Sequence, residues 1–304
     1  QTLNAKAVNI PSETPAKILK TKSGIGFSGD SSDTLYQSSE LVFFPKGDSA
    51  TIMIRNVPFG VGWWWGGAED RTYEGEIHVY RDVAGDLCVT VHLPLETYLK
   101  GVVPYEIGGD SPSEALKAQA VAARSEAVIA LTSELYSGDF HDLTSDVECQ
   151  VFSGNHKRSL ASDQAVDDTR GLVISEQNQV INAYYASNCG GRSELIQKVW
   201  PDRFRAKSYL VSLPDNGKRK GPRLNKNWRA KWWIKSSPRV NCNPEYEPAL
   251  PSWSRKNFRW NRAFSTQELT EMITDDRTLG RLQKIKVLNR GDSGRIHRAR
   301  FIFE

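Results

Sequence analysis

An alanine-rich stretch, residues 113–131, constrains the fold of this chain more than any other feature. Its apolar residues recur at helical spacing: Leu116, Ala120, Val121, Ala123, Ala127, Val128 and Leu131. So many alanines along one stripe predict a helix against which another element packs closely. Ser111, Pro112 and Glu114 predict where it begins, as the N-cap, the first helical residue and the acid of a capping box.

Strand-like segments precede and follow this helix. Before it, apolar and polar residues alternate in "ATIMIRNV", "GEIHVYRD" and "DLCVTVHL". After it, the strand-like segments are "CQVFSG", "GLVISEQNQVINAYYASN" and "KIKVLNRGDSGRIHRARFIF". The pattern predicts a mixed α+β fold, with mostly antiparallel strands around the central alanine-rich helix. We expect "GVVPYEIGG", just before the helix, to be a loop.

The composition is that of an ordinary globular chain. Of its 304 residues, 39% are hydrophobic and 25% are charged. No run approaches the roughly 18 apolar residues that a membrane-spanning helix needs, so we expect no transmembrane segment. The chain begins at Gln1, and two of its four cysteines, Cys149 and Cys189, lie in polar segments bordered by glycine. These features favour a mature exported protein, and a fragment cut at a domain edge would also begin this way.

Basic charge and tryptophan are concentrated in one region. The net charge is +4, but residues 202–262 alone contain 16 basic and 4 acidic residues. Six of the nine tryptophans lie in or beside this region: Trp200, Trp228, Trp232, Trp233, Trp253 and Trp260. The region could bind sugars and anionic polymers, or its tryptophans could anchor a solvated basic loop. Nucleic acid is a weaker candidate, because no nucleic-acid-binding motif is present.

The other three tryptophans form the run Trp63–Trp65. Successive side chains on a strand point to opposite faces, so three adjacent aromatics cannot all share one face. We expect at least one of them to meet solvent or a ligand.

One acid in the sequence has no evident structural role. Glu114 is assigned to the capping box, and Glu96 suits the N-terminal end of a short helix. Glu106 instead follows an apolar run and precedes two glycines. Apolar surroundings raise the pKa of a carboxyl group by desolvation, which suits a general acid. The alternative is a loop acid that only pairs with a lysine.

A known family shares the motifs of this region. The stretch "LPLETYLKGVVPYEIGGDSPSEALKAQAVAARSEA" resembles the signature of the SpoIID/LytB family of bacterial cell-wall proteins. Further pieces resemble the family in the same order, among them "RTYEGEIHVYRD", "YYASNCGGRSE" and "RGDSGRI". The resemblance extends from about Arg71 onward. It divides the chain into an N-terminal β-rich region, residues 1–70, and a SpoIID-like catalytic domain, residues 71–304, with a basic tryptophan-rich insertion at about 216–256.

The resemblance implies a lytic transglycosylase that acts on peptidoglycan glycan strands stripped of their peptides. Its catalytic acid corresponds to Glu106, which would also act as the base. Hydrolysing glycosidases use two carboxylates, and no second acid is evidently placed here. The resemblance also implies an exported protein of the cell envelope, in the periplasm or cell wall, with no required cofactor. The alternative is a non-catalytic glycan-binding protein or an amidase activator that assists other cell-wall hydrolases.

Candidate substrate-binding residues follow from the same resemblance and from polar positions on the central helix. They are Tyr105, Gln119, Arg124, Gln150, Tyr184, Ser187, Asn188, Gly190 and Gly191. The last five belong to "YYASNCGG", which resembles the family motif that lines the cleft. Without the resemblance, this segment would be read as a strand that ends in a glycine turn.

A metal site is doubtful from the sequence. Some family members bind zinc through a cysteine and histidine cluster, but Thr144 and Glu148 stand here where those members have ligands. Cys149, Cys189 and His141 could form an atypical zinc site, and a Cys149–Cys189 disulfide is an equal alternative. Cys88 reads as a buried apolar residue, and Cys242 has no assigned role.

Overall fold

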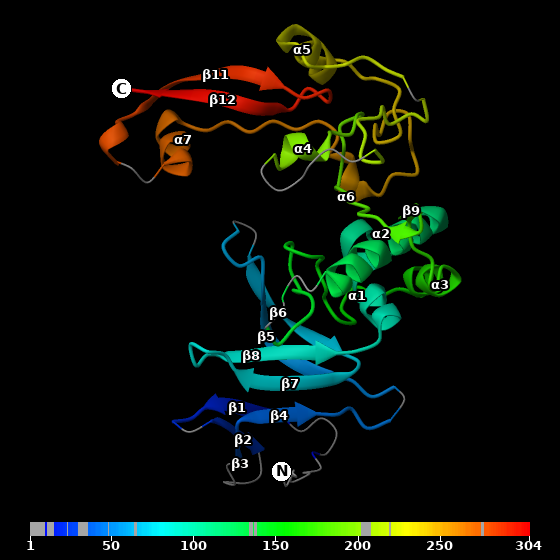
Figure 1. Cartoon of the computed structure of the whole chain (residues 1–304), viewed down its shortest axis with the longest axis vertical. Helices are drawn as coiled ribbons and strands as arrows, with labels where there is room; N and C mark the ends of the chain where they lie inside the picture. The colour runs from blue at the N-terminus through cyan, green and yellow to red at the C-terminus, as the bar shows by residue number, and fades with distance from the viewer. Residues whose placement is uncertain are drawn as a thin grey trace. The chain divides into compact units, whose positions relative to one another are not determined.

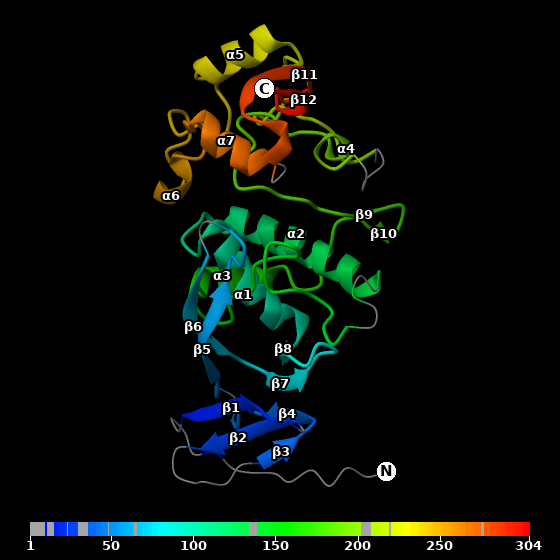
Figure 2. The same ribbon diagram turned by 90° about the vertical axis from the view of Figure 1, so that its left-hand side faces the viewer.

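The computed structural model describes most of the chain, and its strands and helices form a mixed α+β fold, as predicted (Figures 1 and 2). The described residues are 10, 15–22, 24–29, 36–47, 49–63, 66–133, 136, 139–201, 208–218, 220–274 and 277–304. The chain divides into unit 1, Gln1–Tyr184, and unit 2, Tyr185–Glu304. The boundary between the units falls inside the predicted catalytic domain. A catalytic domain can contain more than one compact unit, so this boundary does not test the prediction. The predicted domain boundaries therefore stay predictions.

Unit 1 begins with strands that pair in antiparallel fashion. One sheet has the order β1–β2–β3 (Ala16–Lys20, Ile25–Gly29, Tyr36–Ser38), and a second has the order β4–β7–β8 (Glu40–Phe43, Glu76–Arg81, Leu87–His92). A hairpin joins β5 (Ile52–Phe59) to β6 (Gly67–Tyr73). Because β4 pairs with β7, part of the N-terminal region shares a sheet with the segment that follows residue 71.

The described part of unit 1 also contains the helices α1 (Leu95–Ile107), α2 (Ser113–Thr132) and α3 (Leu160–Asp168). They lie side by side in Figure 1. The main hydrophobic core joins them to β7, through Leu99 and Val102 of α1, Ala120 and Ala123 of α2, and Val79. Each of these five side chains is completely buried. The alanine stripe of α2 is therefore the close-packing face that the sequence predicted.

The start of α2 differs in detail from the prediction. The helix begins at Ser113 after Pro112, and no side chain caps it. The Ser111 hydroxyl donates instead to the carbonyl of Ile107, 2.5 Å away, at the end of α1. Glu114 pairs with Lys117 at 3.3 Å. The predicted capping box is wrong because the serine hydroxyl satisfies a carbonyl of the preceding helix.

A buried ion pair links the three helices. Arg124 of α2 is 1% exposed and donates to both carboxylate oxygens of Glu96 on α1, at 3.0 and 2.8 Å. The same guanidinium donates to the carbonyl of Val166 on α3, at 3.2 Å, and to that of Leu172, at 3.0 Å. Its donors are thus used within the protein, as a buried charge requires.

Two segments expected to be strands are largely irregular. The segment 149–154 has no strand, and 171–188 contains only the two-residue strands β9 (Ser175–Glu176) and β10 (Gln179–Val180). The backbone of the first is bonded elsewhere, since the N–H of Phe152 donates to Ser145. Strand predictions for these segments are therefore wrong, apart from the short β9–β10 pair.

Unit 2 has a smaller core. Its elements are α4 (Ile196–Val199), α5 (Asn227–Lys235), α6 (Ser252–Arg255), α7 (Thr266–Ile273), the 3₁₀ turn η1 (Arg277–Leu279), β11 (Leu282–Arg290) and β12 (Ile296–Phe303). The β11–β12 hairpin is antiparallel, as predicted. The buried cluster consists of Leu224, Trp233, Val240 and Phe258, with Cys242 packed against it. Across the residues described in both units, no helix is long and apolar enough to cross a membrane.

We predict that Glu96→Gln destabilises the chain by about 3–5 kcal/mol, since it leaves the buried Arg124 charge unpaired. Urea unfolding followed by circular dichroism measures this loss. Asp86→Asn is the matched control, because Asp86 pairs with Lys20 at the surface, where the two side chains are 74% and 47% exposed. Losing this exposed pair should lower the free energy of unfolding by less than about 1 kcal/mol. Equal losses in the two variants would contradict the assigned role of the buried pair.

The same pair predicts a pH dependence. Burial tends to raise the pKa of the Glu96 carboxyl, but the hydrogen bonds and charge of Arg124 outweigh it and hold this pKa below its ordinary value. Because the pKa of Glu96 is lower in the folded chain than in the unfolded chain, the ionised carboxylate stabilises the fold at pH values above the unfolded pKa. This stabilisation is lost as the pH falls through the folded pKa. The stability gap between wild type and Glu96→Gln should therefore shrink in acid. A gap that stays constant in urea unfolding at decreasing pH would disprove this linkage.

Candidate functional site

Glu106, the acid selected from the sequence, lies on the last turn of α1. We expected a loop here because proline and paired glycines usually end a helix. Pro104 is instead buried inside the helix, which ends only where the N–H of Gly108 bonds to the carbonyl of Pro104. Burial of the neighbouring valines outweighs the one helical hydrogen bond that proline cannot make. The loop prediction is wrong, and helical backbone holds Glu106 in place.

The Glu106 carboxylate is oriented by a backbone donor from a distant segment. The N–H of Val151 donates to its Oε1 at 3.1 Å, and the side chain of Glu106 is half-buried. Gly101, five residues earlier on α1, allows this approach. A Cβ at Gly101 would lie 2.5 Å from the Phe152 ring and 2.8 Å from the carbonyl of Gly154. The segment 151–154 can therefore lie on α1 only because residue 101 has no side chain.

Two buried polar side chains fix this segment from the other side. The Gln150 amide donates to the carbonyl of Ala123 on α2, at 3.1 Å. Arg71 of β6, 2% exposed, donates to the carbonyl of Phe152, at 3.1 Å, and to the Glu69 carboxylate, at 2.8 Å. Gln150 was predicted to bind substrate, and in the structure it positions the backbone that contacts Glu106. The sequence did not single out Arg71, since its partner is 81 residues away.

Tyr105 lies next to Glu106 and carries a cation over its ring. The Lys157 ammonium is 3.8 Å from the ring centroid, a cation–π contact. Burial raises the pKa of the Tyr105 phenol, and the charge of Glu69 adds to the effect. The residue next to the acid is therefore a protonated phenol, and the exposed lysine over its ring is one that sequence reasoning missed.

Gln119 and Arg124 are both buried on α2. The guanidinium of Arg124 donates its hydrogen bonds to Glu96 and to α3, so its observed role is to position helices. The Gln119 amide nitrogen has no hydrogen-bond acceptor among the residues that the structure describes. A role for either residue in substrate binding stays a prediction.

A second half-buried acid, Glu126, lies further along α2. It accepts hydrogen bonds from the N–H of Ala183 and from the Asn182 amide. Burial raises the pKa of its carboxyl, and these two bonds offset the rise only in part. Glu126 thus ties α2 to the residues just before Tyr184, the half-buried residue that ends unit 1.

The remaining predicted site residues, 187–191, belong to unit 2. Ser187 is exposed, and the Asn188 side chain accepts from the N–H of Gly190 at 2.7 Å. At Gly191, an added Cβ would lie 2.7 Å from the Trp233 ring, so this glycine serves core packing. Gly190 is more open, with the nearest atoms to a Cβ at 3.8 Å or beyond. Only Gly190 of the pair has the space predicted for a ligand, and the cleft-lining role of this segment stays a prediction.

The cysteines predicted as ligands lie in different units. Cys149, in unit 1, contacts the Tyr136 hydroxyl at 3.4 Å, and His141 packs on the Tyr136 ring. Around Cys149, the described residues bring no set of three ligand atoms together, so they do not fit the zinc cluster of the family. Cys189, in unit 2, lies 3.8 Å from Cys242, and Asp215 completes a group whose ligand atoms all lie within 4.8 Å. Cys242 and Asp215 are ligand candidates that the sequence did not suggest.

The sequence left open whether the tryptophans of the basic region anchor it to the core or are exposed to a ligand. The structure contains tryptophans of both kinds. Trp233 of α5 is buried and donates to the carbonyl of Gly190 at 2.8 Å, so it anchors the region. Trp228 and Trp232 lie on the same helix four residues apart and are 66% and 55% exposed. Trp63 is also exposed, while Trp64 and Trp65 lie outside the described residues.

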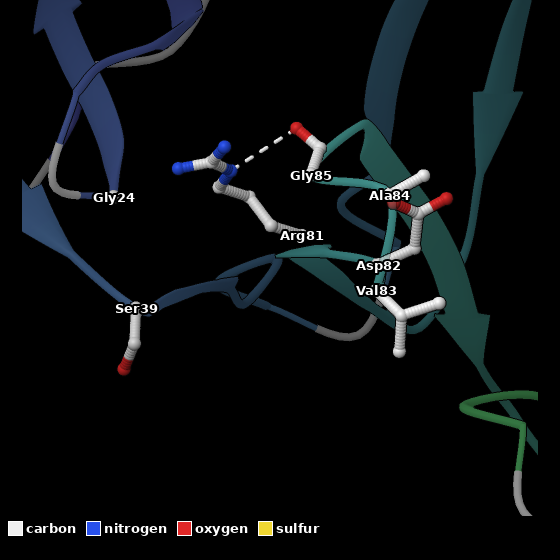
Figure 3. Close-up of a pocket in the computed structure, with 7 residues that line it drawn as sticks. All are labelled: Gly24, Ser39, Arg81, Asp82, Val83, Ala84 and Gly85. Carbon is white, nitrogen blue, oxygen red and sulfur yellow. Dashed lines mark hydrogen bonds between the residues drawn. The ribbon is translucent and has the colours of Figure 1, made fainter.

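Figure 3 shows a pocket in unit 1 at the turn between β7 and β8. Its charged residues, Arg81 and Asp82, hold the turn itself. The Arg81 guanidinium donates to the carbonyls of Gly85 and Thr21, and the Asp82 carboxylate accepts from the N–H of Asp86. None of the predicted site residues lines this pocket.

Comparison with known proteins identifies the segment around Glu106. Residues 84–175 match the family model described as Stage II sporulation protein. An uncharacterized protein of Brachyspira hyodysenteriae is 37% identical over 114 residues, which are 38% of this chain and 31% of that protein. Residues 187–191 lie beyond the match to the family model.

Two further relatives have descriptive names. The Amidase enhancer of Bacillus subtilis is 34% identical over 117 residues, 38% of this chain and 15% of that protein. Stage II sporulation protein D of Bacillus amyloliquefaciens is 30% identical over 145 residues, 43% of this chain and 41% of that protein. The chain thus spans less than half the length of these curated relatives. The resemblance read from the motifs is confirmed over residues 84–175, the segment that matches the SpoIID family model.

Proposed function

We propose that this chain is a peptidoglycan lytic transglycosylase, with Glu106 as its single acid and base. It would cleave the β-1,4 bond between N-acetylmuramic acid and N-acetylglucosamine in glycan strands stripped of their peptides. The observation that carries the proposal is the placement of Glu106. It is a half-buried carboxylate, fixed by helical backbone and by the N–H of Val151, within the SpoIID segment. We also propose that the protein is exported and acts in the cell envelope.

The chemistry needs one carboxyl group used twice. Protonated Glu106 donates its proton to the glycosidic oxygen as the bond to the muramic C1 breaks. The resulting carboxylate then accepts the proton of the muramic C6 hydroxyl, while the C6 oxygen forms a bond to C1. The products are a free N-acetylglucosamine end and a 1,6-anhydro-N-acetylmuramic acid end. Glu106 regains its proton, so no water is consumed.

The surroundings of Glu106 support this use. A general acid and base must keep its geometry through both proton transfers. The hydrogen bond from Val151 orients Oε1, and Gly101 and Gln150 hold the segment that supplies it. Lys157, which lies over the Tyr105 ring, offers a cation to the muramic carboxylate.

The competing candidate is a non-catalytic wall-binding protein or an amidase activator. The relative named Amidase enhancer favours it, and a fold can persist after its chemistry is lost. Partners would then be other cell-wall hydrolases in addition to the glycan. Both candidates predict glycan binding, so only turnover separates them.

We predict that Glu106→Gln lowers the rate of glycan cleavage by about 100- to 10,000-fold, the usual worth of general acid and base catalysis. The measurement is mass spectrometry of products from peptide-stripped glycan strands. Glu126→Gln is the matched control, because Glu126 is also a half-buried acid that accepts a backbone N–H. It should keep most of the activity if one carboxyl suffices.

The products also separate the mechanisms. Wild type should release fragments that end in 1,6-anhydro-N-acetylmuramic acid. Ends one water heavier would mean hydrolysis and would require a second carboxylate. Equal binding without cleavage by wild type and Glu106→Gln would reject the enzyme and favour the wall-binding candidate.

The exposed tryptophans of α5 generate a separate prediction. Trp228→Ala and Trp232→Ala should each weaken binding to glycan strands by about 2- to 10-fold, through loss of aromatic stacking. Co-sedimentation with purified glycan measures the binding. Phe44→Ala, which removes a 65% exposed aromatic from unit 1, is the control and should bind as wild type does. Unchanged binding in both tryptophan variants would mean that these residues are only part of a solvated basic surface.

A further inference from the structure

Three side chains with metal-binding atoms meet in unit 2, although they are far apart in the sequence. Cys189, Asp215 and Cys242 are all half-buried, and their ligand atoms lie within 4.8 Å of one another. The two sulfur atoms are 3.8 Å apart. Among the residues with assigned positions, this is the one group of three such ligands.

Backbone hydrogen bonds hold the three chain positions together. The N–H of Asp215 donates to the carbonyl of Gly191 at 3.0 Å, and the N–H of Asn241 donates to the carbonyl of Asp215 at 2.8 Å. The N–H of Cys242 donates to the Asp215 carboxylate, also at 2.8 Å. The backbone of unit 2 therefore brings the three side chains together before any metal binds.

The spacing of the sulfur atoms fits one metal ion. Two thiolates bound to zinc at about 2.3 Å in tetrahedral geometry lie about 3.8 Å apart, whereas a disulfide needs about 2.0 Å. Two thiolates and one carboxylate are ligands that zinc accepts, and a fourth position would stay open to water. We propose that Cys189, Asp215 and Cys242 form a zinc site in unit 2.

The electrostatics of the thiols are consistent with this site. The hydrogen bond between the two thiols lowers the pKa of the Cys189 thiol, against the effect of burial, and the N–H of Gly191 adds to the lowering. The same bond raises the pKa of the Cys242 thiol.

A metal would also supply what unit 2 lacks in apolar burial. Its buried hydrophobic cluster contains only four residues among those described, and Cys242 packs against that cluster. A zinc ion at Cys242 would join the core to the loop at Cys189 and to Asp215. Small cores are commonly reinforced by such a link. The site would stabilise unit 2 and fix the loop that carries Gly190 and Gly191.

This assignment differs from the pairing suggested by the sequence. A disulfide between Cys149 and Cys189, or a zinc site with Cys149 and His141, would engage the same Cys189 sulfur. The alternatives therefore exclude one another and can be separated by one set of variants. Cys149→Ser is the matched control, since it removes a half-buried thiol that contacts Tyr136 in unit 1.

The test is zinc binding by the full chain kept reduced. Wild type and Cys149→Ser should each retain one zinc per chain after gel filtration. Cys189→Ser and Cys242→Ser should each lose more than about 100-fold in zinc affinity, since even outer-shell changes cost 10- to 100-fold. Cobalt added to the wild type should give the visible bands and sulfur charge-transfer band of tetrahedral thiolate coordination. This spectrum needs no variant, so a misfolded mutant cannot decide the result.

Other results overturn the proposal. Reduced wild type that binds no zinc would reject the site, and so would zinc that persists in a Cys189→Ser/Cys242→Ser double variant. Loss of zinc in Cys149→Ser would favour the zinc site predicted from the sequence, in which Cys189 binds the metal together with Cys149 and His141. A disulfide-linked peptide containing Cys189 and Cys242 in the protein as purified would make the pair an oxidised cross-link. Because the readout is metal, none of these results depends on glycan cleavage.

Discussion

The buried pair of Arg124 and Glu96 is the interaction on which the architecture of unit 1 depends. A guanidinium that is 1% exposed must use its donors within the protein, and here it joins α2 to α1 and α3. The alanine stripe of α2 allows the close approach that the pair requires. With α1 fixed in this way, Gly101 admits the segment that brings the N–H of Val151 to Glu106. The candidate site therefore rests on helix packing and on the irregular segment that this packing admits.

Periodicity predicted the elements whose signals are local. The alanine-rich helix and the β7–β8 and β11–β12 hairpins agree with the patterns in the sequence. Errors occurred where a tertiary contact outweighed a local signal. Pro104 suggested a helix end, but burial keeps it inside α1. Ser111 suggested an N-cap, but its hydroxyl satisfies a carbonyl of the preceding helix. The apolar residues at 149–154 suggested a strand, but they pack on α1.

The candidate site was predictable only in its central residue. Glu106 could be chosen because its neighbours are apolar and because the surrounding motif resembles a known family. Its supporting contacts could not be found, since Val151 is 45 residues away and acts through its backbone. The proximity of Cys189 and Cys242 was equally hidden, since 53 residues separate them and neither lies in a ligand motif. Such contacts depend on the folded chain and leave no local signal.

The central claim is that one carboxyl group cleaves glycan without water. The most direct test is to digest peptide-stripped glycan strands with wild-type protein in oxygen-18 water. Mass spectrometry then measures how much oxygen-18 the newly formed muramic ends contain. Ring closure by the C6 hydroxyl predicts that the new muramic ends contain no solvent oxygen, because the oxygen that binds C1 comes from the same sugar. Oxygen-18 at the new muramic ends would show that water is the nucleophile, and it would contradict the single-acid account of Glu106.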